Sequence, residues 1–171
     1  MARTSLQNVQ SVKDVLQTWN WDAFFPSIPG VADTRPFSYK MLSTSIPGFQ
    51  VEQVPLEVHG IKLHFAGRRV WQGTWEATVV ETRDASTRSL LVNWAEYQRS
   101  WKQNTGTYKQ DYAVTVELVL YDDLPKEVSN ILLIGAFPIQ VGDATLDSQS
   151  GIVQYSVTFS YDYTEDRPMG A

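Results

Sequence analysis

The chain has 171 residues, of which 43% are hydrophobic and 19% charged, a composition that fits one globular domain with room for an appendage. It contains no cysteine, which excludes disulfides, thiolate metal sites and a cysteine nucleophile. The 14 Lys and Arg residues against 19 Asp and Glu give a net charge of -5, which argues against a surface that grips nucleic-acid phosphates.

The N-terminal part predicts a helical arm. Thr4 and Gln7 have the spacing of a capping box, and apolar residues recur at three- and four-residue steps as far as Trp19. Prolines and a glycine then break regular structure before the strands begin. We therefore expect residues 1–34 to form an arm that packs either on its own domain or on a neighbouring subunit.

Alternating apolar and polar residues predict the first strands of a β domain over residues 35–164. One strand begins at Phe37, and residues 50–58 and 61–65 flank a His-Gly dipeptide that is typical of a two-residue hairpin connection. The chain is expected to turn again at Gly67. Three alternating residues of the second hairpin strand are predicted to face the core: Ile61, Leu63 and Phe65.

Four further runs and one helix complete the predicted domain. The runs cover residues 74–81, 112–121, 131–141 and 152–163. The helix begins at Asp84 and carries Trp94 and Trp101 on an apolar side that should lie on a sheet. Pro138 is expected at an edge or a bulge. The pattern thus predicts an antiparallel β-sandwich or open barrel of about seven strands with one packed helix, followed by a loose tail over residues 165–171.

The sequence offers no catalytic or metal-binding constellation. His59 and His64 match no metal or triad spacing, paired carboxylates come where strands end, and no glycine-rich run precedes Lys and Ser or Thr. We predict no enzyme activity, no cofactor and no metal site. No run of 18 apolar residues and no signal-peptide pattern is present, so we expect a protein without a membrane partner.

Five segments in the same order resemble the tail tube proteins of contractile-tailed bacteriophages. They are residues 61–68 (IKLHFAGR), 75–80 (WEATVV), 92–94 (VNW), 135–142 (GAFPIQVG) and 157–163 (VTFSYDY). The resemblance covers about residues 36–164, and its fourth segment is the most specific. It implies a homohexameric ring whose subunits share one continuous β-barrel, with rings stacked inside a contractile sheath. The fold of this family is similar to that of the type VI secretion tube protein.

The resemblance also implies a function, partners and a location. Such a tube conducts viral DNA into the host during ejection, belongs to the virion tail and is assembled in the host cytoplasm. Its partners would be further copies of itself, the tail sheath protein, a baseplate or tube initiator, and tape measure and tail terminator proteins. A lumen of small polar and acidic side chains would let DNA pass without binding it. Our candidates for the lumen are Thr74, Glu76, Thr78, Thr115, Glu117, Gln154, Ser156, Thr158, Ser160 and Asp162.

Contacts between subunits and rings are expected in the arm and the hairpin. The candidates are Leu6, Val9, Trp19, Trp21, Phe24, Phe25, Val51, His59 and Ile61. Two alternatives stay open: the tube of a phage-derived bacteriocin or secretion system, and a monomeric carbohydrate- or ligand-binding β-sandwich that uses exposed tryptophans. Few charges lie on residues 115–120 and 154–160, which favours strands that are paired in an assembly over a monomer with protected edges.

Overall fold

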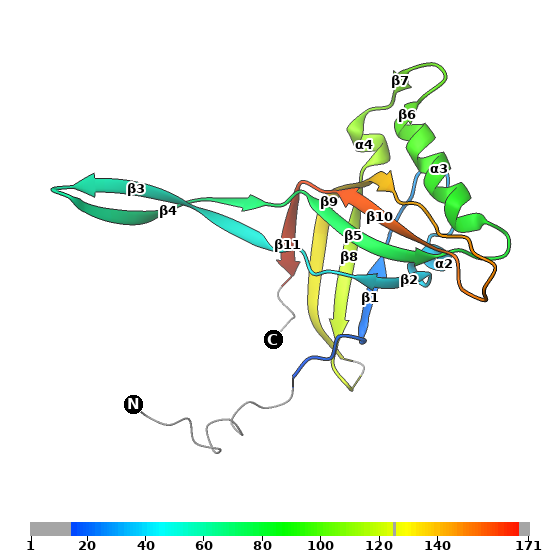
Figure 1. The fold of residues 1–171 in the computed structure, drawn as a ribbon, viewed down its shortest axis with the longest axis horizontal. Coiled ribbons are helices and arrows are strands. Elements are labelled where there is room, and N and C mark those ends of the chain that lie inside the picture. The colour runs from blue at the N-terminus through cyan, green and yellow to red at the C-terminus, as the bar shows by residue number, and fades with distance from the viewer. Residues whose placement is uncertain (1–14, 125, 168–171) are drawn as a thin grey trace.

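The computed structural model describes residues 15–124 and 126–167, so the predicted helix before residue 15, with Leu6 and Val9, lies outside the described residues. Figure 1 shows a body of β-strands, helices beside it, and a long two-stranded hairpin that projects away from the body. The mainly antiparallel β fold predicted from the sequence is confirmed.

The strands are β1 (Trp21–Phe24), β2 (Met41–Thr44), β3 (Phe49–Val58), β4 (Ile61–Trp71), β5 (Thr74–Val80), β6 (Arg99–Ser100), β7 (Thr105–Gly106), β8 (Val114–Tyr121), β9 (Glu127–Val141), β10 (Gln154–Ser160) and β11 (Tyr163–Arg167). The helices are α2 (Arg35–Ser38), α3 (Ser86–Gln98) and α4 (Lys109–Tyr112).

The body is one seven-stranded antiparallel sheet that bends along β9. The strand order is β1-β8-β9-β10-β5-β2, and β11 also pairs with β9. Residues 127–136 of β9 pair with β8 and β11, whereas residues 137–141 pair with β10. We call β1, β8, β11 and the first part of β9 the first half-sheet, and β2, β5, β10 and the last part of β9 the second half-sheet. Strands that switch sheets at a bend in this way let two half-sheets pack across each other, as Figure 1 shows.

Aromatic side chains fill the space between the half-sheets. The Phe25 ring lies 5.1 Å from that of Phe37 and 5.8 Å from that of Phe159, measured between ring centroids. The indole N–H groups of Trp75 and Trp94 donate to main-chain carbonyl oxygens at 2.8 and 2.9 Å. Both tryptophans are therefore buried without an unpaired polar atom, and for Trp94 this agrees with the packed side predicted for its helix.

The long helix α3 covers one side of this core, with Leu91 and Trp94 buried. The helix does not begin at Asp84 as predicted. Ala85 takes the position before the helix, and Glu81, which directly follows β5, supplies the hydrogen-bond acceptors for its first turn. The Glu81 carboxylate accepts the N–H groups of Thr87 and Arg88 at 3.0 and 2.9 Å. Burial raises the pKa of this carboxyl, but its main-chain hydrogen bonds lower that pKa by more, so it lies below its ordinary value.

Three segments differ from the sequence prediction. Residues 21–24, assigned to the arm, form β1 and pair with β8, with Trp21 opposite Leu120. Phe37 lies in α2 and not in a strand, because the Pro at the first turn favours a helical start, and the first following strand begins at Met41. The tail was expected to be loose, but β11 pairs with residues 130–134 of β9 as far as Arg167. Pairing to an open strand edge outweighs the polar composition of this tail.

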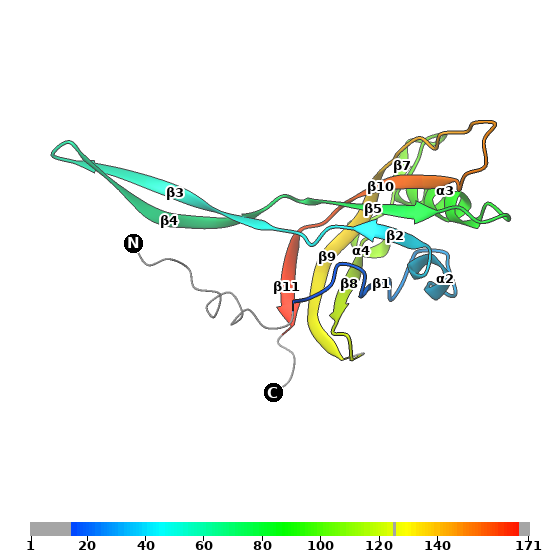
Figure 2. The same ribbon diagram turned by 60° about the horizontal axis from the view of Figure 1, so that its bottom comes forward.

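The predicted hairpin is confirmed, but it is longer than expected and leaves the body. His59 and Gly60 have φ of 49° and 77°, as a type I′ turn requires. Gly67 is not a turn: Gln53 pairs with Ala66 and Val51 with Arg69, so two residues of β4 oppose one of β3 in a β-bulge. A Cβ at Gly67 would lie 3.1 Å from the Glu52 carbonyl oxygen, which explains the glycine. The strand then continues to Trp71, and Figure 2 shows the twisted hairpin extending well beyond the sheet.

Candidate assembly interface

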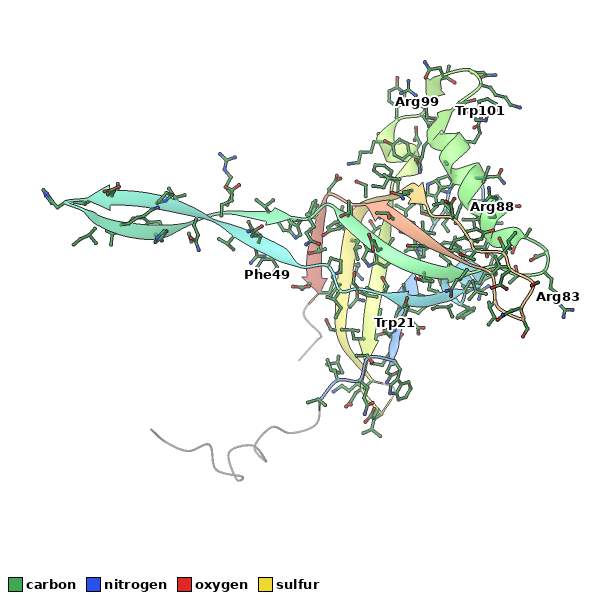
Figure 3. All side chains as sticks on the ribbon, in the orientation of Figure 1. Trp21, Phe49, Arg83, Arg88, Arg99 and Trp101 are labelled. Carbon is green, nitrogen blue, oxygen red and sulfur yellow. The ribbon has the colours of Figure 1, made fainter. Side chains whose placement is uncertain are left out.

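One face of the hairpin is apolar and has no core to cover. Direct pairs across β3 and β4 place six apolar side chains on this face: Val54 opposite Phe65, Leu56 opposite Leu63, and Val58 opposite Ile61. Their exposed fractions run from 42% for Val58 to 65% for Ile61. The prediction that Ile61, Leu63 and Phe65 face the core is wrong, since the hairpin carries them away from the body (Figure 3). A contiguous exposed apolar face on a two-stranded ribbon is typical of an interface.

The outer surface of the second half-sheet is polar and nearly uncharged. Thr78 lies beside Ser43 and Ser156, and Thr158 lies between Glu76 and Gln140. The residues that alternate with them, including Trp75, Ala77 and Val157, are buried in the core. Seven of the ten lumen candidates lie on this surface, which we call the polar face. They are Thr74, Glu76, Thr78, Gln154, Ser156, Thr158 and Ser160.

The structure does not bring the other three lumen candidates to the polar face. Thr115 and Glu117 lie on β8, in the first half-sheet, where Glu117 forms an ion pair with Arg167 at 3.5 Å. Asp162 lies at the turn between β10 and β11, and its carboxylate contacts the Lys109 ammonium group at 2.6 Å. The strand pattern alone could not separate these residues from the seven, because alternation shows which side faces the core but not which half-sheet a strand joins.

Among the residues that the structure describes, the second half-sheet has two strand edges without a partner strand, which we call free edges and which the sequence analysis did not locate. One edge is β2, where Leu42 is 52% exposed. The other is the last part of β9, because β8 pairs with β9 only as far as Ala136, and Ile139 is also 52% exposed there. In the sequence, Pro138 was the residue that indicated this edge. Its predicted place at an edge or a bulge is confirmed, since the pairing of β9 with β10 shifts register there. Free strand edges present unpaired main-chain donors and acceptors to other chains.

The part of the chain that the structure describes contains no group of three His, Asp or Glu side chains placed to hold a metal ion. None of its helices has the length and apolar character needed to span a bilayer. The tryptophans divide between core and surface: Trp75 and Trp94 are buried, while Trp19 and Trp101 are 68% and 78% exposed. Trp101 was predicted on the packed side of α3, but it lies beyond the end of that helix.

The sequence model of the phage tail tube protein family matches residues 12–165. The chain belongs to this family. The resemblance seen in the sequence segments is thus confirmed, and the match includes the N-terminal residues that form β1. No curated protein matches the chain.

Solved structures of contractile injection systems share the fold of this tail tube family member. A chain from the anti-feeding prophage tube-terminating cap aligns with a TM-score of 0.67 at 12% identity, over 92% of this chain and 94% of the other. A chain from the sheath/tube terminator of the extracellular contractile injection system PVC gives 0.64 at 14% identity, over 92% and 99%. A chain from the PVC sheath-tube complex gives 0.58 at 14% identity, over 98% and 100%. At these identities the likeness concerns the fold.

The tail tube family member presents its predicted contact residues unevenly. Trp19, Val51, His59 and Ile61 are exposed, the last three on the hairpin. Trp21 and Phe24 are half-buried in β1. Phe25 was predicted to contact a neighbouring subunit through the arm. Its ring instead packs against other aromatic rings inside the core, so it offers no surface to a second subunit.

Proposed function

We propose that this chain is the structural subunit of a tail tube, in which homohexameric rings stack into a hollow cylinder inside a contractile sheath. The observation that carries the proposal is the second half-sheet, with four antiparallel strands and, within residues 15–124 and 126–167, a free edge on each side. Because the number of strands is even, β2 and the last part of β9 run in opposite directions. Rotation about a tube axis along the strands therefore brings β2 of one copy antiparallel to β9 of the next.

Ring closure by this pairing removes the free edges. Four strands from each of six copies give a barrel of 24 strands, wide enough to leave a channel and not a packed interior. A heterologous contact of this kind closes into a ring when its rotation angle fits. The polar face would then line the channel, since the opposite side of the same strands is committed to the core of each subunit.

The polar face suits a channel for DNA. Hydroxyl and amide side chains dominate it, with Glu76 as a carboxylate and with no Lys or Arg among its paired residues. Such a surface binds phosphates weakly, so a polyanion can slide through it during ejection. The role is mechanical and needs no catalysis. The proposed location is the virion tail, after assembly in the host cytoplasm.

The apolar face of the hairpin would be covered by a subunit of the next ring. The hairpin continues the strand pair β2 and β5, so it extends from the polar face along the direction in which rings stack. Further proposed partners are the sheath around the tube, an initiator at the baseplate, a tape measure protein in the channel and a terminator at the end. The tube of a contractile injection system is the second candidate, favoured by the solved structures that share the fold.

Crosslinking across the ring contact tests the proposal, because the chain has no native cysteine. Ser43→Cys and Gln140→Cys place thiols on the polar face at the two free edges. A short bismaleimide, which tolerates a register shift of one pair, should give a ladder of covalent species that ends at six subunits, and electron microscopy should show six-fold rings. Each single variant is the control, since neither can propagate a ladder. A double variant that stays monomeric at all concentrations and gives no ladder would contradict ring closure through these edges.

A further inference from the structure

A pocket of about 320 Å³ lies beside the free edge of β9, under the end of α3. Ala95 and Gln98 of α3 line one side, and residues 138–141 of β9 line the other. Its volume exceeds the roughly 150 Å³ of an apolar cavity that holds a benzene ring, so a leucine side chain fits with space for part of a strand. The pocket therefore adjoins the edge where the proposed ring contact forms.

A polar atom at this pocket has no partner within the described chain. The Gln98 Nε2 group is buried and donates no hydrogen bond to the described residues. Buried side-chain amides are nearly always hydrogen-bonded, because an unpaired donor loses its bonds to water without replacement. An acceptor supplied from outside the subunit would satisfy it, and a strand edge presents main-chain carbonyl oxygens of that kind.

The other free edge carries a side chain that matches the pocket. Leu42 is the exposed large apolar residue of β2, whereas its neighbours Met41, Ser43 and Thr44 are half-buried or polar. The register of β2 against β5 shifts between Met41 and Ser43, so Leu42 is the extra residue of a bulge and has no partner on β5. Its side chain is free to be buried by something else.

We propose that β2 of a second copy docks at this pocket, with Leu42 filling it and a main-chain carbonyl oxygen of the same strand accepting the Gln98 Nε2 group. This inference rests on the proposed ring and names the side chains that fix the contact between its subunits. Pairing between strand edges is governed by the backbone, and a slip of two residues keeps each side chain on its own face. A leucine that fits one pocket and an amide that needs one acceptor would fix the register between subunits.

Moving the leucine side chain from β2 to the pocket wall tests this assignment. Ala95→Leu fills the pocket, and Leu42→Ala removes its occupant. Each change prevents the burial of one leucine side chain at the contact, so each is expected to raise the concentration for half-maximal ring assembly about tenfold. The double variant Leu42→Ala with Ala95→Leu restores the filled volume and should recover most of the loss. Light scattering and sedimentation velocity measure assembly. Asn93→Leu, an exposed position of α3 that does not line the pocket, is the matched control.

A second variant examines the amide, and unfolding curves check that every variant folds. Gln98→Met keeps the length of the side chain and removes the donor, so it should weaken assembly while the thermal midpoint of the monomer stays the same or rises, since an unpaired buried donor is lost. If wild-type rings and the Ser43–Gln140 ladder form while Ala95→Leu assembles like Asn93→Leu, the pocket assignment is wrong and the ring proposal stands. If the wild type gives no rings and the Ser43→Cys/Gln140→Cys double variant gives no ladder, both proposals fail.

Discussion

Gly135 lies at the bend of β9, where the sheet changes from its first half to its second. Its φ is +72°, in the left-handed region, and the Asp162 carboxylate occupies the space that a Cβ would take. Asp162 in turn contacts the Lys109 ammonium group at 2.6 Å, and its N–H donates to the Ile134 carbonyl oxygen at 2.9 Å. The bend, the turn between β10 and β11, and α4 are thus joined through a position that only glycine fills without strain.

Gly135→Ala should destabilise the subunit by at least 1–2 kcal/mol, about the cost of a left-handed conformation for an L-residue. Displacement of Asp162 from Lys109 adds to this loss. Urea unfolding followed by tryptophan fluorescence measures it. Gly151→Ala is the control, because Gly151 has open space around it and no positive φ. The control should change stability little or raise it slightly. Equal midpoints for the two variants would show that the bend tolerates a side chain.

At the scale of the elements, the sequence pattern predicted strands and their apolar faces well, but it predicted poorly which elements pack or pair with one another. The alternation in β4, β5 and β10 predicted strands and apolar faces that the structure contains. The same alternation could not tell that β5 faces a core while the hairpin faces outward, since both have one apolar side. Trp21–Phe24 join the sheet through β8, about a hundred residues later in the chain, and no local pattern encodes that pairing. The seven residues of the polar face were found by alternation, but the free edges depend on where β8 stops pairing.

The hairpin offers a test at this scale. Leu56→Glu with Leu63→Glu places two adjacent charges on its apolar face, where both side chains are already exposed. We expect the subunit to keep its thermal midpoint and its rings, and the stacking of rings to be lost, because a carboxylate is costly to bury in an apolar contact. Electron microscopy counts tube lengths. The control pair, Gln53→Glu with His64→Glu, adds charge to the opposite face of the same strands. Tubes of normal length in the first pair would contradict a ring contact through this face.

At the scale of the whole molecule, the features that are unfavourable in a single subunit would become complementary in the proposed cylinder. Two free edges, an apolar ribbon without a core and an unpaired amide are each costly in a monomer. In the proposed tube, the ring would join the edges and the stack of rings would cover the ribbon. The subunit carries a net charge of -5, so six copies sum to -30, and the channel surface adds little positive charge against that background. The assembled tube would therefore repel a polyanion at long range and hold it weakly at short range.

Thr158→Lys and Thr115→Lys form a matched pair that decides which half-sheet faces the channel. Both are half-buried threonines on the outer side of a strand, one in the second half-sheet and one in the first. Each variant adds a ring of lysines to every layer of the tube. Lysines in the channel should retain DNA through counterion release, with an affinity that falls steeply as salt rises, so Thr158→Lys is expected to slow ejection and lower infectivity at low ionic strength. Thr115→Lys should leave DNA passage unchanged, provided that its tubes assemble with normal length. Retention of DNA by Thr115→Lys alone would place the first half-sheet on the channel and overturn the assignment of the polar face.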